Sequence, residues 1–423
     1  MTNVHRGKWY RCWPVYVLAA SVPVSIAAIS LSKLALLLVA LWLLLRPTRV
    51  AEAPHRWDDK STVVVLLMLA TLALSMTYTV APWNLAANDV VKYSKLLLIV
   101  LIPFLITTRK QAYTALAIYA AAQIFVLLSS WLLAFGTALP WVSSAAYSAT
   151  NTVFHLYIHQ SIMTTGLAAL CWHLRHDLKA PWFRVLASVL CVLALANVMF
   201  LLPGRSGYFA AVTVIAAALI WETRRQWRWL ALLIPVVIVG LALVSSTHFK
   251  SRAQLAITEA LAYQVGNDPV SSTGLRLNFW YRSAQAIAER PLTGFGAGSW
   301  GEQYHKLDGG TDSSYKGSGG NPHQEYLLWG VLLGVGGMGL LIALQAALWW
   351  DARNFSPSHA RAIRSIILIL AITAMFNSVL YDGVIGDYFC LMLGLLLALG
   401  KTNATAPAIA APVAANPARM EAS

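Results

Sequence analysis

Long apolar blocks dominate this sequence and limit what it can fold into. Twelve of them, each near the roughly 20 residues that a helix needs to cross a bilayer, are separated by charged or turn-forming residues. Only 11% of the 423 residues are charged, against about 25% in soluble domains. The sequence therefore predicts an all-α, polytopic integral membrane protein with about 12 transmembrane helices. The blocks lie at about residues 13–30, 32–46, 61–79, 94–108, 111–135, 154–173, 184–202, 207–221, 228–246, 323–350, 363–380 and 387–400.

The start of the chain resembles a secretory signal peptide, because basic residues precede the apolar run from Trp13 to Ala28. A second apolar block follows at once, so we interpret the run as an uncleaved first helix. Only Lys33 and neighbouring serines divide these two blocks, and we expect the break between the two helices there.

Positive charges are distributed unequally between the two sides of the predicted bundle. The formal charge is +14, and 20 of the 31 Lys and Arg residues fall on the side that holds both chain ends. By the positive-inside rule this side is cytoplasmic, and so are both termini. In a soluble protein this charge would suggest a nucleic-acid partner. Here the basic residues lie mostly in short loops, where they orient helices, and we expect no such partner.

Residues 247–322 form the only long polar stretch between the apolar blocks. They follow the ninth block, which places them opposite the termini and, in a bacterial inner membrane, in the periplasm. We expect nine helices in residues 1–246, this large periplasmic loop, three helices in 323–403 and a disordered cytoplasmic tail in 404–423. The tail is rich in Ala and Pro and has almost no large apolar side chains with which to form a core.

Parts of this loop have helical character. Apolar residues recur with helical spacing at 251–265 and 277–289, and Pro291 ends the second helix. From Gly294 to Gly320 the chain is rich in glycine and polar residues. That composition is typical of a mobile loop or lid, and we expect no packed layer there.

Two arginines on the expected outer side could bind phosphate. Arg205 lies in the short connection 203–207 between two apolar blocks, where its guanidinium can make bidentate contacts to an anion. The alternative is an interfacial arginine that contacts lipid headgroups. Arg276 precedes a loop helix and is otherwise a solvated charge. Together in one cavity, the two would compensate the charge of a pyrophosphate leaving group.

His323 follows Asn321 and Pro322 where an apolar block begins, so its imidazole should lie near the membrane boundary. With an ordinary pKa of about 6.5, a histidine can accept the proton of an attacking hydroxyl group. The alternative is a structural histidine at this boundary. Glu325 lies two positions further on a different helical face, so we do not treat it as a sure partner of His323.

Further ionisable residues flank the blocks on the outer side. Lys92 and Lys95 could add positive charge to the site, or only anchor the end of a helix. Asp382 and Asp387 flank an expected turn at 383–386. A carboxylate there could orient an arginine or a histidine, or cap the last helix.

No metal site is expected. His155 and His159 have i and i+4 spacing, but the sequence offers no third ligand, and a structural role at the lipid interface is favoured. The four cysteines fall in or beside apolar blocks and show neither a metal-binding spacing nor a disulfide framework.

Taken in order, these motifs resemble the O-antigen ligase and polymerase superfamily. They are Gly-Arg-Ser-Gly-Tyr at 204–208, Arg276 in the large loop, Arg-Pro-Leu-Thr-Gly-Phe-Gly at 290–296, and Asn-Pro-His-Gln-Glu-Tyr-Leu at 321–327. Each motif is weak alone, but their order and membrane side make the combination specific. Gln324 stands where the family more often has Asn, while the histidine before it is intact.

The resemblance implies a glycosyltransferase of the bacterial inner membrane. It would move preassembled O-antigen polysaccharide from undecaprenyl pyrophosphate to a sugar of lipid A-core in the periplasm, completing lipopolysaccharide without nucleotide, metal or other cofactor. Carried over by motif, Arg205 and Arg276 would bind the pyrophosphate, and His323 would activate the acceptor hydroxyl. Lys92 or Lys95 resembles a basic position early in these proteins.

Tyr208, within the first motif, and Asp387 are candidate orienting residues. Direct attack by the acceptor oxygen would invert the anomeric centre, since the sequence offers no convincing carboxylate nucleophile for a two-step route.

Two alternatives stay open. An O-antigen polymerase or a protein O-oligosaccharyltransferase would share the motifs and differ in the acceptor. A transporter of lipid-linked sugars belongs to another class, and it would be expected to place polar residues or broken helices near the middle of the membrane. The candidate groups instead gather at the outer face, which favours an enzyme.

Overall fold

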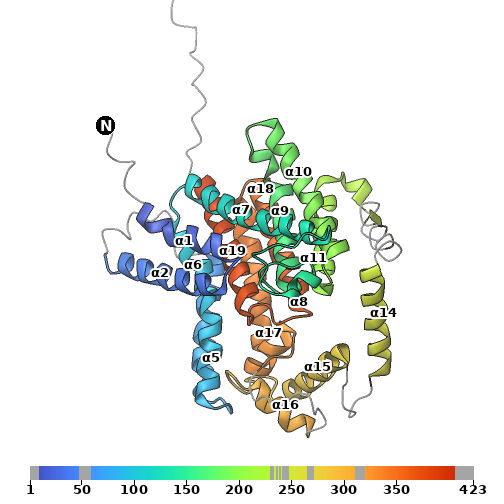
Figure 1. Cartoon of the computed structure of the whole chain (residues 1–423). Coiled ribbons are helices and arrows are strands. Elements are labelled where there is room, and N and C mark those ends of the chain that lie inside the picture. Colours follow the sequence, from blue (N-terminus) through green and yellow to red (C-terminus); the bar gives the residue numbers. More distant parts are fainter. Residues whose placement is uncertain are drawn as a thin grey trace, which may run out of the picture.

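The computed structural model describes residues 9–46, 59–228, 247–263, 271–309 and 320–404, with residues 233, 234, 237 and 240. Every regular element in this part of the chain is a helix, which confirms the all-α prediction there (Figure 1). The α-helices are α1 (Trp9–Ser21), α2 (Ile26–Leu44), α4 (Lys60–Ser75), α5 (Trp83–Tyr93), α6 (Leu97–Leu105), α7 (Arg109–Ala134), α8 (Ala145–Ala149), α9 (Tyr157–Leu174), α10 (Pro181–Ala196), α11 (Arg205–Glu222), α14 (Thr247–Ala262), α15 (Ser272–Glu289), α16 (Trp300–Asp308), α17 (Glu325–Asp351), α18 (Pro357–Ala374) and α19 (Gly383–Ala404).

Five helical stretches within the described residues are long and apolar enough to cross a membrane. The chain is therefore consistent with a membrane protein, while the count of twelve spans remains a prediction. The ninth predicted block falls mostly, and the tail beyond Ala404 entirely, outside the described residues. The five stretches are Ile26–Leu44, Arg109–Ala134, Pro181–Leu201, Glu325–Asn354 and Gly383–Thr402.

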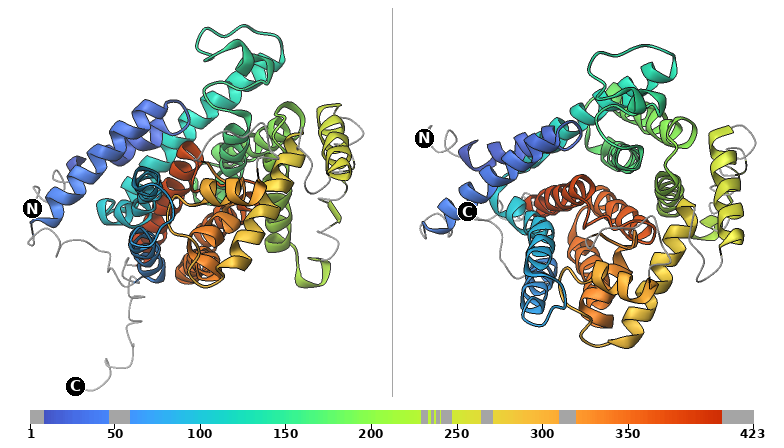
Figure 2. Two further views of the ribbon diagram at one scale, coloured as in Figure 1. Left: turned by 90° about the horizontal axis from the view of Figure 1, so that it is seen from below. Right: turned by 60° about the horizontal axis from the view of Figure 1, so that its bottom comes forward.

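The last helix, α19, forms the centre of the bundle. Of its most apolar 18-residue window, 94% is buried, and it packs against α6, α7 and α18. Figure 2 shows this red helix near the middle of the other helices. α6 is almost wholly buried as well. The continuous apolar runs of these two helices thus form the core rather than a lipid-facing surface.

The expected break at Lys33 is wrong. The chain turns earlier, between Val22 and Ser25, because Pro23 cannot continue helix α1 and the Ser25 side chain caps α2 by accepting the Ala28 amide hydrogen. Lys33 lies inside α2, and its ammonium is 2.8 Å from the carboxylate of Asp387 on α19. An ion pair between these two helices explains this charge without a loop.

Contacts between helix ends gather the basic loops on one side of the bundle. The end of α17 caps the start of α4, because Asp351 accepts a hydrogen bond from the Ser61 amide (2.9 Å). The opposite end of α4 leads to Thr79, whose hydroxyl donates to the Ala297 carbonyl in the large loop (2.7 Å). Two ion pairs, Asp59–Lys401 and Arg175–Glu222, and the contact between the His359 Nε2 atom and the Asp177 carboxylate (3.0 Å) join the other basic loops on the first side.

Helix α17 is broken, and the chain after α15 fills the break. At Gly334 the backbone adopts φ 68° and ψ −161°, which interrupts the helical hydrogen bonds. The carbonyls of Val331 and Leu332 accept hydrogen bonds from the amides of Phe295 and Gly296, both at 2.9 Å. The glycine-rich motif is therefore paired to α17 by its backbone, and Figure 1 shows α15 and α16 beside the lower part of that helix.

The expectation of a mobile loop from Gly294 to Gly320 is consequently wrong for residues 294–309. Phe295 and Trp300 are buried, and α16 packs on α15. The glycines permit this packing because positive φ at Gly294 and Gly296 lets the backbone approach its neighbours closely. Residues 310–319 lie outside the described residues. The predicted stop before Pro291 is confirmed, since α15 ends at Glu289.

Gly334→Ala is expected to destabilise the protein by about 1–3 kcal/mol, because the new Cβ meets a strained backbone conformation. That atom would lie 2.3 Å from the Pro291 carbonyl oxygen. Gly336→Ala is the matched control, since a Cβ there meets no atom within 4 Å. Thermal unfolding followed by tryptophan fluorescence measures both variants, and equal midpoints would contradict this account of the break.

Candidate functional site

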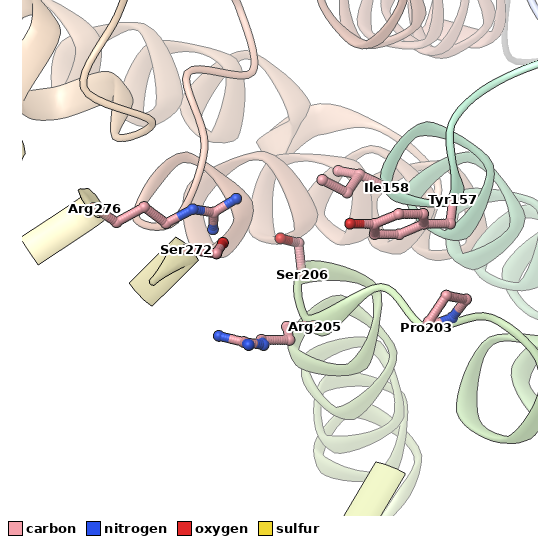
Figure 3. Close-up of a pocket in the computed structure, with 7 residues that line it drawn as sticks. All are labelled: Tyr157, Ile158, Pro203, Arg205, Ser206, Ser272 and Arg276. Carbon is pink, nitrogen blue, oxygen red and sulfur yellow. The ribbon is translucent and has the colours of Figure 1, made fainter. Parts of the chain in front are cut away.

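A small pocket lies where three helices begin. Its volume is about 50 Å³, and its lining includes Tyr157 of α9, Arg205 of α11 and Ser272 of α15 (Figure 3). Each of these residues is the first of its helix. A helix start leaves backbone N–H groups without an intrahelical partner and carries partial positive charge. Three such starts around one pocket favour an anion.

Two arginines line this pocket together. Arg205 donates from Nη1 to the Thr273 hydroxyl (3.0 Å), and its Nη2 lies 3.9 Å from a carboxylate oxygen of Glu259. Arg276 donates from Nη1 to the carbonyl of Phe376 (3.2 Å). Figure 3 shows the two side chains reaching the same space from α11 and α15. Burial and the nearby charge of Arg205 lower the pKa of Arg276, because both disfavour the charged guanidinium. A bound anion would stabilise that charge.

A larger cavity adjoins the small pocket, with which it shares Ile158 and Arg276. Its volume is about 330 Å³. Several polar side chains from distant parts of the sequence line it, so it can hold a hydrophilic group next to the anion pocket. These are Lys92, His159, Asn321, His323, Asn377, Ser378 and Asp382.

His323 sits at this cavity in an unusual backbone conformation. Its φ is 52°, a region that non-glycine residues rarely adopt. Two contacts hold the preceding turn: the His323 amide donates to the side chain of Asn321 (2.9 Å), and the Trp280 indole donates to the Pro322 carbonyl (3.1 Å). Gln324 then caps α17 by accepting from the Leu327 amide. Gln324 therefore has a local role as the N-cap of α17, directly after the histidine.

The electrostatic surroundings keep the imidazole neutral. His323 is exposed by surface area, but the protein that surrounds its ring and the charge of Arg276 lower the pKa of the imidazole from 6.5 to about 4, against a smaller opposing effect of Asp382. A neutral imidazole at neutral pH has a free nitrogen lone pair and can accept a proton. The structure thus places a proton acceptor beside the arginine-lined pocket.

The turn between α18 and α19 forms one wall of the cavity, and it was largely missed by the sequence analysis. Glu325 is fully buried and accepts hydrogen bonds from the amides of Leu380 (2.9 Å) and Tyr381 (3.3 Å), and from the Tyr93 hydroxyl (2.7 Å). Its hydrogen bonds support this wall, and among the described residues none of them goes to His323. Asn377 donates to the hydroxyl of Ser206 at the start of α11, which joins the wall to the small pocket.

Asp382 and His159 pair across the cavity, with the His159 Nε2 atom 3.3 Å from the carboxylate. Burial alone would raise the pKa of Asp382, but the contacts with His159 and the Ile385 amide lower it below its ordinary value. Asp382 also caps α19, which begins at Gly383. The expected turn at 383–386 is therefore wrong: these residues are the first turn of the helix.

The structure separates the two candidate lysines. Lys92 lines the larger cavity, with its ammonium 3.7 Å from the centre of the Tyr381 ring. Lys95 is buried behind the wall and donates to the Asp382 carbonyl. Of the two, Lys92 has access to a ligand in this cavity.

The two candidate orienting residues, Tyr208 and Asp387, make different contacts. Tyr208 donates its hydroxyl to the Leu202 carbonyl (2.8 Å), which closes the turn that carries Arg205. Within the part of the chain that the structure describes, Asp387 pairs with Lys33 and not with an arginine or histidine, so these contacts give no support to the expected orienting role.

His155 and His159 have different partners in the structure. The His155 Nε2 atom lies 3.1 Å from the Val22 carbonyl, while His159 faces Asp382. Among the described residues, no group of three or more His, Cys, Asp or Glu side chains could hold a metal ion.

Comparison with known proteins agrees with the motif resemblance. Residues 186–342 match the family model described as O-antigen ligase, and this range includes Arg205, Arg276 and His323. The match supports the predicted family. A curated relative, an uncharacterized protein of Haemophilus influenzae, is 23% identical over 219 residues, which are 50% of this chain and 53% of the relative. The chain thus matches about half of that relative's length.

Proposed function

We propose that this chain, whose residues 186–342 match the O-antigen ligase family, transfers O-antigen polysaccharide from undecaprenyl pyrophosphate to a sugar of lipid A-core. The observation that carries the proposal is the pocket between three helix starts, with Arg205 and Arg276 on its lining and the His323 cavity adjoining it. This arrangement suits a reaction in which a pyrophosphate leaves as a proton is removed from an acceptor.

The small pocket would bind the pyrophosphate of the donor. Arg205 and Arg276 are positioned before the reaction by Thr273 and the Phe376 carbonyl. Preorganised positive groups stabilise the charge that develops on a leaving group more than they stabilise the bound donor. Lys92 would add positive charge from the larger cavity.

His323 would act as the general base. The acceptor hydroxyl oxygen forms a bond to the anomeric carbon, the bond from that carbon to the pyrophosphate oxygen breaks, and the hydroxyl proton passes to the imidazole. Undecaprenyl pyrophosphate leaves with the bonding electron pair. A single displacement of this kind inverts the anomeric configuration, and retention in the linkage between glycan and acceptor would contradict it.

The pH dependence of the reaction follows from the lowered pKa of His323. A general base must be neutral, so kcat/KM is expected to fall only as the pH drops through about 4, the pKa of His323 in the free protein. An ordinary histidine would lose activity near pH 6.5. A profile of kcat/KM measured between about pH 4 and pH 7 distinguishes a histidine with the lowered pKa from an ordinary one. The folded state is checked at each pH. A midpoint near 6.5 would contradict this environment for the base.

The proposed topology places the site in the periplasm and both termini in the cytoplasm, with nine helices in 1–246, a loop in 247–322 and three helices in 323–403. It is supported by the contacts that gather the basic loops at the ends of the helices opposite the site. A membrane-impermeant thiol reagent on cells with a permeabilised outer membrane should label Lys306→Cys and not Lys179→Cys. The reverse pattern would overturn this orientation.

The acceptor separates the proposal from its nearest alternatives. Purified protein with undecaprenyl-pyrophosphate glycan should extend lipid A-core, seen as a shift on a gel. Extension of another lipid-linked glycan would indicate a polymerase, and transfer of glycan to a peptide would indicate a protein O-oligosaccharyltransferase.

The transporter alternative predicts broken helices that line a cavity. Gly334 does break α17, but it is buried against Pro291, which leaves the enzyme favoured.

A further inference from the structure

A third cavity, which is shallow and largely open at the surface, lies on the opposite side of the bundle from the proposed active site. Its volume is about 480 Å³, and its lining divides into two parts. At one end are the basic side chains Arg175, His176 and Arg184; along the rest are residues of α10 that are apolar except for Ser188. The ion pair of Arg175 with Glu222 joins it to the basic loops, which the positive-inside rule places in the cytoplasm.

The apolar part follows one stripe of α10. Val185, Val189 and Val192 line the cavity, and between 48% and 64% of each side chain is exposed. Arg184 stands at the start of the stripe and Leu193 at its end. Nine residues of helix extend about 14 Å, which is close to one leaflet of a hydrocarbon core of about 30 Å. The cavity therefore has the length and the polarity gradient of a lipid with its headgroup at the basic end.

Two arginines at the basic end of this cavity could bind a negatively charged group. Arg175 lies over the Trp172 ring, 3.5 Å from its centre, and 3.1 Å from a carboxylate oxygen of Glu222, so part of its charge is already compensated. Arg184 is exposed, and its hydrogen bond within the described residues runs from Nε to the Leu178 carbonyl (2.9 Å). Its terminal nitrogens stay available beside the start of α10, where the helix dipole also favours an anion.

We infer that this cavity binds an anionic phospholipid of the cytoplasmic leaflet, with its phosphate at Arg184 and Arg175 and an acyl chain along the valine stripe of α10. Phosphate and guanidinium form bidentate charge-assisted hydrogen bonds, and basic cavities at the cytoplasmic ends of membrane helices suit such headgroups. The inference is independent of the transfer reaction, because none of these residues lines either pocket of the proposed active site.

Native mass spectrometry of the full chain, delipidated and then mixed with cardiolipin, phosphatidylcholine or inorganic phosphate, tests the inference. Wild type should retain cardiolipin over phosphatidylcholine. Arg184→Glu removes the cation and is expected to weaken cardiolipin retention at least about fivefold, since one basic residue near an anionic surface contributes about 1 kcal/mol. Val189→Trp fills the stripe and is expected to weaken cardiolipin retention by blocking the acyl chain. The matched control is Arg353→Glu, an exposed arginine outside this cavity, which should retain cardiolipin like wild type.

Three results would overturn the inference. They are equal cardiolipin retention in wild type, Arg184→Glu and Val189→Trp; equal retention of phosphatidylcholine and cardiolipin by wild type; and displacement of cardiolipin by millimolar phosphate, which would indicate a simple anion site. Thermal unfolding of each variant accompanies the measurement. Val189→Trp keeps every charge, so its result separates loss of the acyl groove from loss of the headgroup contact.

Discussion

Replacement of His323 by alanine is expected to reduce the rate of glycan transfer about 10²- to 10⁴-fold, the usual contribution of a general base. The imidazole lines the cavity next to Arg276, and its lowered pKa keeps it in the proton-accepting form. Because the arginine pocket is unchanged, binding of the donor should persist. Single-turnover transfer and donor binding, measured on the same preparation, give the two quantities separately.

His305→Ala is the control for this experiment, because His305 lies on α16 in the same loop and lines neither pocket. It should transfer glycan at nearly the wild-type rate. Transfer by His323→Ala within a few-fold of wild type would remove the general base from the mechanism. Loss of donor binding together with transfer would instead assign His323 to the binding of the donor.

Replacement of Arg276 by alanine is expected to lower transfer about 10²- to 10³-fold, the effect of removing one preorganised group that stabilises developing charge. Arg276 lines both the small pocket and the larger cavity, so it is placed between the leaving group and the acceptor. Arg276→Lys should recover little, because an ammonium cannot reproduce the planar fork that bridges two phosphate oxygens. The loss should appear mainly in the rate of the chemical step.

Lys306→Ala serves as the control cation, since its exposed ammonium pairs with Glu289 on the loop surface. It should leave transfer unchanged at physiological salt, where exposed pairs contribute little. If Arg276→Ala and Lys306→Ala reduced transfer equally, the loop would act through its overall charge, and the specific role of Arg276 would be wrong.

The residues of the candidate site were predictable because their chemistry is local in sequence. Arg205 follows a glycine at a helix start, and His323 follows the Asn-Pro pair where an apolar block begins. The structure agrees with both predictions, since Arg205 is the first residue of α11 and His323 lies two residues before the start of α17. The all-α fold was predictable for the same reason, since apolar block length alone requires helices.

Long-range packing was not predictable in this way. The break at Gly334 depends on backbone contact with Pro291, more than 40 positions earlier, and apolar periodicity carries no sign of it. The wall between α18 and α19 depends on Glu325, which looked like a neighbour of His323 and instead supports Leu380. Lys33 was read as a loop residue because its partner, Asp387, lies 354 positions away.

Composition was misleading in the glycine-rich motif. Glycine and polar residues usually indicate a mobile loop, but here positive φ at Gly294 and Gly296 allows close backbone packing against α17 and the segment around Thr79. The apolar residues between the glycines, Phe295 and Ala297, are buried as a result. Alternation of glycine with apolar residues is the signal that could have indicated a packed segment.

The most direct test of the central claim counts both products of one reaction. Protein in proteoliposomes receives undecaprenyl-pyrophosphate glycan and lipid A-core, and the undecaprenyl pyrophosphate released is compared with the glycan joined to lipid A-core. The account predicts equal amounts for wild type and neither product for His323→Ala on the time scale of one wild-type turnover. Movement of intact donor across the membrane, with no undecaprenyl pyrophosphate released, would contradict it and indicate a transporter.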